Sequence, residues 1–131
     1  MKDQAHWRRV LLRTEESAKR YEEEIAKNGL NAECPLCRSN EVIQTFEHWI
    51  LMKNKFPYDR YFTKSDMLVT KRHVPDDNLS EAEEAELMHL KHQVLCSDYD
   101  SIIEHMSLNK SIPEHTHLHL VEYKRPDGLP R

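Results

Sequence analysis

An alternating run of histidines near the C-terminus constrains the fold more than any other feature of the sequence. Residues 115–121 read HTHLHLV. In a β-strand, successive side chains point to opposite faces, so His115, His117 and His119 are expected to share one face. Neighbouring histidines would be roughly 6.6 Å apart along the strand, and the outer two about 13 Å apart. An adjacent pair could therefore share a metal ion or a phosphate group, and the three histidines need not have one function.

The other apolar residues predict two helices and four further strands. The first helix is amphipathic, and the second begins at Ser80 followed by Glu83, which is the spacing of a capping box. The expected helices span residues 7–29 and 80–96, and the expected strands span residues 42–46, 49–52, 67–70, 102–108 and 115–123. Short connections between the strands favour antiparallel pairing. The predicted fold class is α+β, with a five-stranded antiparallel sheet packed by two main helices.

Length and charge limit the domain organisation and the partners. The chain has 131 residues and a formal net charge of -4, which favours one domain and disfavours stable nucleic-acid binding. No stretch approaches the roughly 20 apolar residues of a membrane span, and the first thirty residues are heavily charged, so we expect a cytoplasmic protein without a membrane partner. The single domain over residues 1–131 is expected to divide into an N-terminal amphipathic helix (1–30), a core (34–123) and a tail (124–131).

The cysteines are interpreted from their spacing. Cys34 and Cys37 form a C-x2-C pair around Pro35, which stiffens the turn, and both thiols can face one point. Such a pair with one cysteine left over suits a metal site in a reducing compartment better than a disulfide framework. The remaining cysteine, Cys96, is interpreted as a small buried residue near the end of the second helix.

Several ordered motifs together resemble the histidine-triad superfamily of nucleotide hydrolases and transferases. The run at 115–121 is similar to the alternating histidine motif of that family, with Thr116 as the imperfect position. The segment NKFP at 54–57 corresponds to the family's ribose-contacting loop, and MLVTKRHV at 67–74 corresponds to its third strand and a following histidine. The resemblance covers about residues 34–123 and leaves the N-terminal helix outside. It also implies that two subunits can pair as a homodimer that extends the sheet.

For the metal, the resemblance implies a structural zinc site. Zinc-containing members bind the ion through a C-x2-C pair, the histidine after the third strand and the first triad histidine. The matching residues here are Cys34, Cys37, His73 and His115. Two thiolates and two imidazoles form a closed tetrahedral set. A site of this kind can contribute on the order of 10 kcal/mol to folding.

For catalysis, the resemblance implies a covalent nucleotidyl-histidine intermediate. His117 corresponds to the nucleophile that attacks the α-phosphate, and His119 would donate to a non-bridging phosphate oxygen. Asn54 would contact the ribose hydroxyls, and Asn109 and Ser111 occupy the stretch where the family contacts phosphate. The expected substrate is a nucleotide or a nucleotide conjugate.

The chain also departs from the family pattern before the histidine run. Relatives carry a glycine-rich connector with a glutamine, whereas residues 109–114 read NKSIPE and contain no glycine. Lys110 is a candidate to replace the lost positive charge, and Ser65 occupies a position that is a histidine in many members. The remaining histidines have no motif support and are interpreted as surface or helix-face residues. They are His6, His48, His89, His92 and His105.

Three other functional hypotheses stay open at this point. The chain could be a nucleotide-binding or regulatory zinc module that has lost turnover, because its connector is short and free of glycine. It could be a zinc-stabilised interaction protein in which the cysteines pair with two histidines of the run. It could also bind a metal through His117, His119 and Glu122 in the manner of an oxygenase or a cupin, although a cupin should be nearly all strand.

Overall fold

The centre of the fold is a five-stranded antiparallel sheet. The computed structural model describes residues 10–28, 34–37 and 41–126, and within them the strands lie in the order β1-β2-β3-β5-β4. Their bounds are Val42–Thr45 (β1), Trp49–Lys53 (β2), Phe62–Thr70 (β3), Ser101–Ile103 (β4) and His117–Tyr123 (β5). Together with helices α2 (Glu15–Asn28) and α3 (Glu81–His89), they confirm the predicted α+β class. Pairing of two subunits stays a prediction.

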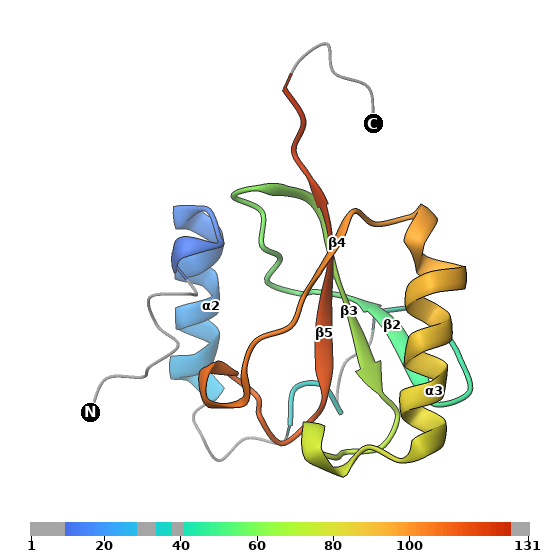
Figure 1. Ribbon diagram of the computed structural model, residues 1–131. Coiled ribbons are helices and arrows are strands. Elements are labelled where there is room, and N and C mark those ends of the chain that lie inside the picture. Colours follow the sequence, from blue (N-terminus) through green and yellow to red (C-terminus); the bar gives the residue numbers. More distant parts are fainter. Residues whose placement is uncertain (1–9, 29–33, 38–40, 127–131) are drawn as a thin grey trace.

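Helix α3 covers one face of the sheet with the main apolar core (Figure 1). Leu118 and Leu120 of β5 pack there with Trp49 of β2 and with Leu90, which follows α3. The helix begins as predicted, because the Ser80 hydroxyl accepts from the Glu83 backbone N–H while the Glu83 carboxylate accepts from the Ser80 N–H. This core holds β5 against α3, as an interior strand between β3 and β4.

The end of this helical region differs from a regular helix. A π-helical segment, η2 (Leu90–Val94), and a short 3-10 turn, η3 (Leu95–Ser97), follow α3. The Leu95 N–H donates to the Leu90 carbonyl five residues earlier, and both leucines are buried. Cys96 is therefore exposed, so the expectation of a buried cysteine is wrong.

Helix α2 lies on the opposite side of β5 and β3 from α3 (Figure 1). It begins at Glu15 instead of running unbroken from residue 7, because the Thr14 hydroxyl accepts from the Ser17 N–H and caps it there. Asp59 accepts from the N–H and hydroxyl of Thr14 and from the hydroxyl of Ser17, which fixes this end of α2 to the loop before β3. The predicted helix ends at 7 and 29 lie outside the described residues.

Strands β1 and β2 differ from their predicted lengths by one residue, and the other three differ by more. β3 begins at Phe62 and has nine residues, whereas only residues 67–70 were expected. β4 has three residues, because Met106 starts a 3-10 turn, η4 (Ser107–Asn109), in which the Asn109 N–H donates to the Met106 carbonyl. β5 begins at His117, since Thr116 is bonded through its N–H to Val74 beyond the end of β3. His115 thus precedes the strand that was expected to carry it.

Among the described residues, no helix combines the length and the apolar character that a membrane crossing requires.

Candidate functional site

Four side chains converge at the end of the sheet where β3 stops and β5 starts. One donor atom from each of Cys34, Cys37, His73 and His115 lies within 4.8 Å of the others. The Sγ of Cys37 is 3.2 Å from Nδ1 of His73 and 3.4 Å from Nδ1 of His115, and the Sγ of Cys34 is 3.6 Å from Nδ1 of His115. The sequence prediction of this set as neighbours is confirmed, and the cluster could hold a metal ion.

The spacing and chemistry of the donors fit a tetrahedral metal centre. In a zinc site with Zn–S near 2.3 Å and Zn–N near 2.05 Å, a sulfur and a nitrogen would be about 3.6 Å apart. The Nε2 of His115 is 2.7 Å from the Thr70 carbonyl oxygen, which can only accept, so Nε2 carries the proton. The lone pair then lies on Nδ1, the nitrogen beside both thiols. A backbone acceptor for the second ring nitrogen is the usual support of a metal-bound histidine.

The residues of this cluster differ in burial. Leu36, between the cysteines, packs in a core cluster with Met52, Met67 and Val69. The Cys37 N–H donates to the Cys34 carbonyl over 3.1 Å and closes the turn. His115 is buried, and burial lowers its pKa, whereas Cys37 and His73 are exposed. The cluster is therefore open to solvent on one side.

His117 lies beside the cluster, at the first position of β5. Its Nδ1 is 2.8 Å from the His115 carbonyl oxygen, so Nδ1 carries a proton that it donates to this acceptor. The pKa of His117 is lowered to about 4, mainly by burial and also by the nearby charge of Lys110, while the backbone hydrogen bond and the charge of Asp76 act in the opposite direction. The imidazole is therefore neutral near pH 7, with its lone pair on Nε2. That is the state in which histidine acts as a nucleophile.

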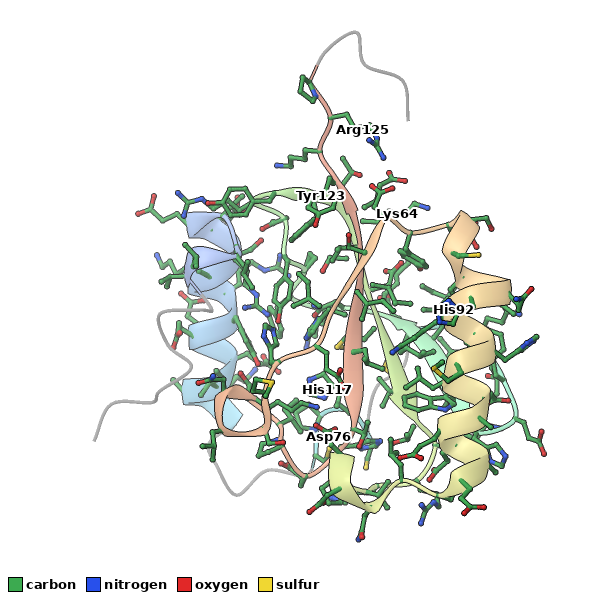
Figure 2. All side chains as sticks on the ribbon, viewed as in Figure 1. Lys64, Asp76, His92, His117, Tyr123 and Arg125 are labelled. Carbon is green, nitrogen blue, oxygen red and sulfur yellow. The ribbon has the colours of Figure 1, made fainter. Side chains whose placement is uncertain are left out.

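A buried ion pair lies close enough to His117 to affect its titration. The Nζ of Lys110 is 2.6 Å from one carboxylate oxygen of Asp76 and 2.8 Å from the other, and the lysine side chain is only 1% exposed. Asp76 starts the short turn η1 (Asp76–Asn78), and Figure 2 shows it at the same end of the molecule as His117. The sequence pointed to Lys110 only by position, and the structure adds that its charge is buried and partnered.

His119 belongs to a second group of aromatic side chains further along the same face of β5. Its Nε2 is 3.0 Å from the Tyr58 hydroxyl, which is also 2.8 Å from Nε2 of His105. The Tyr58 ring stacks on the His119 ring with centroids 4.4 Å apart. Sequence reasoning missed both partners, and it was wrong to place His105 among the surface or helix-face histidines, because this residue follows β4 and contacts the site. Neither residue belongs to a motif.

The other predicted binding residues have different surroundings. The Oδ1 of Asn54 accepts from the Phe56 N–H over 3.0 Å, while its Nδ2 is buried without a hydrogen-bond partner among the described residues. Asn109 and Ser111 are exposed, at the end of η4 and just after it. The contacts of all three residues with a nucleotide stay predictions.

A surface cavity lies on the other side of the sheet. It has a volume of about 400 Å³, and Thr116 and Leu118 of the histidine run contribute to its wall together with Leu87 and Met88 of α3. His117 and His119 do not line it. Adjacent residues of a strand face opposite sides, so Leu118 faces the cavity while its neighbours His117 and His119 face away from it. Asp76, which pairs with Lys110, also lines the cavity.

The alternative site made of His117, His119 and Glu122 receives no support. Among the described residues, the donors that converge are those of the cysteine–histidine cluster, which does not contain Glu122. The Glu122 carboxylate accepts instead from the Thr63 hydroxyl over 2.9 Å.

Comparisons with known proteins do not assign the chain to a family. No family model matches the chain, and no curated protein matches it significantly. The resemblance to the histidine-triad superfamily therefore stays a prediction from the motifs of this sequence.

Proposed function

We propose that the chain is a nucleotide hydrolase or nucleotidyl transferase of the histidine-triad type, in which His117 attacks the α-phosphate. The observation that carries the proposal is the hydrogen bond from Nδ1 of His117 to the His115 carbonyl. This bond fixes the tautomer, and burial keeps the ring neutral, so Nε2 holds a lone pair near pH 7. The substrate class is a phosphoanhydride, a phosphoramidate or a sugar nucleotide.

The reaction then has two displacement steps. In the first, the Nε2 lone pair of His117 forms a bond to the α-phosphorus while the bond to the leaving group breaks, and the leaving group departs with that electron pair. In the second, water or an acceptor hydroxyl bonds to phosphorus, and the electron pair of the broken P–N bond returns to Nε2. The acceptor loses one proton and the leaving group gains one, so the cycle balances. The His115 carbonyl stabilises the positive ring of the intermediate throughout.

Other side chains would bind the phosphate and the ribose. His119 donates to a non-bridging oxygen, where negative charge has to be stabilised. Lys110 supplies the positive charge that the glycine-free connector lacks, and Asp76 holds its ammonium group in place. Asn54 offers its unused Nδ2 donor to a ribose hydroxyl. Asn109 and Ser111 are further phosphate contacts on the exposed connector.

The metal in this proposal is zinc, held by Cys34, Cys37, His73 and His115. Mixed thiolate and imidazole donors suit zinc, and four protein ligands leave no open position, so the ion is structural. It orders His115, whose carbonyl oxygen orients His117. Thiolate ligands need reducing conditions, which agrees with a cytoplasmic protein.

The test is acid-stabilised labelling of the purified, metal-loaded protein. A panel of dinucleoside polyphosphates, nucleoside phosphoramidates and sugar nucleotides with a labelled α-phosphate is offered to wild type and to His117→Ala. We expect a covalent label on wild type and none on the variant. The matched control is His92→Ala, which removes an exposed histidine on the α3 side (Figure 2) and should label like wild type. A label that survives in His117→Ala would overturn the proposal.

The second candidate is a nucleotide-binding module without turnover. The observation that favours it is the Lys110–Asp76 pair, because a lysine already neutralised by a carboxylate is less available to a phosphate. A metal-loaded wild type that binds nucleotides from the panel but acquires no label would support this candidate and exclude the nucleotidyl-histidine enzyme.

A further inference from the structure

Tyr58 links His119 to a histidine that no motif predicts. The tyrosine is 3% exposed, and its hydroxyl lies between two imidazole nitrogens, at 3.0 Å from Nε2 of His119 and 2.8 Å from Nε2 of His105. The rings of His105 and His119 also meet edge to face, with centroids 5.4 Å apart. Hydrogen bonds therefore connect His105 through Tyr58 to His119, and these three side chains are called the relay.

The relay has a direction, because a phenol carries one proton. Tyr58 can donate to only one imidazole at a time and must accept from the other. If His119 is to donate to a phosphate oxygen while it is neutral, its proton has to lie on Nδ1, because Nε2 faces the phenol. In that case Tyr58 donates to Nε2 of His119 and accepts from the Nε2–H of His105. The opposite direction would leave Nδ1 of His119 without a proton.

The N-terminal part of the chain holds Tyr58 in this position. The Arg13 guanidinium lies 4.7 Å from the centre of the Tyr58 ring and 4.4 Å from that of Tyr21, and its Nε donates to the Phe56 carbonyl over 2.8 Å. Tyr21 of α2 stacks on Phe56 with centroids 4.9 Å apart. On the other side, the Tyr58 N–H donates to the Ser65 hydroxyl. The ring therefore has little freedom to turn its hydroxyl away from the histidines.

We propose that Tyr58 and His105 are positioning residues that place the proton of His119 on Nδ1, and that the segment before α2 secures them through Arg13. The proposal rests on the proposed function, in which His119 donates to the transferred phosphate. It assigns a role to α2, which the resemblance to a known family does not cover. It also explains why His105, which follows a short edge strand, is turned inward to contact Tyr58.

The first experiment reads the proton directly. Nitrogen-15 NMR on the metal-loaded full chain, at a pH where the imidazoles are neutral, reports which ring nitrogen of His119 is protonated. We expect Nδ1 in wild type and a shift towards Nε2 in Tyr58→Phe, which removes only the hydroxyl. The matched control is Tyr99→Phe, because Tyr99 donates its hydroxyl to Asp66 instead of to a histidine. A His119 that keeps its tautomer in Tyr58→Phe would overturn the proposal.

The second experiment follows the covalent labelling rate. Loss of one oriented hydrogen bond should lower kcat about tenfold in Tyr58→Phe with little change in KM. His105→Ala should show the same loss, and His105→Gln should recover most of it, because the amide can donate to Tyr58. Equal rates in His105→Ala and wild type would overturn the proposal. A wild type without any label would overturn the proposed function instead, while the NMR result would still decide the direction of the relay.

Discussion

The two faces of β5 differ sharply although they belong to the same seven residues. Leu118 and Leu120 point into an apolar cluster with Trp49 and Leu90, whereas His117 and His119 on the other face are also buried but each is tied to a polar partner. Burying a polar ring costs free energy unless its hydrogen bonds are made. The apolar face therefore stabilises the fold, and this stability offsets the cost of holding neutral histidines in the interior.

Metal removal is expected to have the largest effect on the histidine face. Chelation, or Cys37→Ser, should lower the free energy of unfolding by several kcal/mol, up to the roughly 10 kcal/mol typical of structural zinc. Thermal unfolding with and without a chelator measures it, with bound metal counted in parallel. Cys96→Ser, which changes an exposed cysteine outside the cluster, should retain the metal and the melting temperature. Full metal content in Cys37→Ser would contradict the ligand set.

The next effect separates chemistry from stability on one strand. His117→Ala should abolish covalent labelling and lower the turnover rate by about 10⁴-fold, since loss of a nucleophile leaves only binding and electrostatic effects. Its melting temperature should change little compared with metal loss, because the site faces away from the main core. Single-turnover kinetics and thermal unfolding of the same sample test both statements. A variant that unfolds at room temperature would show that His117 also supports the fold.

A substitution of the adjacent Leu118 should lower stability and leave the reaction rate unchanged. Leu118→Ala leaves a cavity in the core against Leu90 and should cost about 3 kcal/mol of stability. The labelling rate per folded molecule should stay near that of wild type. Denaturant unfolding combined with active-site titration gives the two quantities separately. If Leu118→Ala loses rate while it keeps stability, the division between the two faces fails.

A smaller effect concerns the loss of stability in acid on the α3 side of the sheet, which depends on the Glu83 carboxylate. Hydrogen bonds from Arg72 and from the Ser80 N–H hold the pKa of Glu83 at about 2, below its usual value near 4.5. A lowered folded-state pKa means that the ionised carboxylate stabilises the fold fully above pH 4.5, and that this contribution is lost as the pH falls towards 2. Glu83→Gln should therefore cost about 2 kcal/mol at pH 7 and make the stability less sensitive to acid.

Urea unfolding at several pH values between 3 and 7 measures this difference. Glu84→Gln is the control, because Glu84 is the exposed neighbour of Glu83 on the first turn of α3. Parallel pH profiles of Glu83→Gln and wild type would show that the Arg72 pair contributes nothing.

The sequence predicted the features whose signals are local. Strand alternation located β5, the Ser80 and Glu83 spacing located the start of α3, and the C-x2-C spacing indicated a metal site, to which the resemblance to a known family added the two histidines. The first two depend on residues that are close in the chain, whereas Cys34 and His115 are 81 residues apart. The structure confirms that the four donors are neighbours, whereas the bound ion stays a proposal.

What the sequence did not predict depends on long-range packing. Tyr58 and His105 are 47 residues apart and meet only because β4 pairs with β5. The start of α2 at Glu15 depends on Asp59, which is 45 residues away from Thr14. The late start of β5 follows from a bond between Thr116 and Val74. No periodicity within a window of 10 to 20 residues contains such information.

The π-helical turn after α3 gives this protein a place where chain length can change. Its wide turn accommodates one residue more than a regular helix would need to bring Leu90 and Leu95 to the core. A deletion of one residue between these leucines would restore regular 3.6-residue winding and keep both of them inside. The same deletion in β5 would exchange the leucine and histidine faces. Natural insertions and deletions in such a domain should therefore gather at this turn.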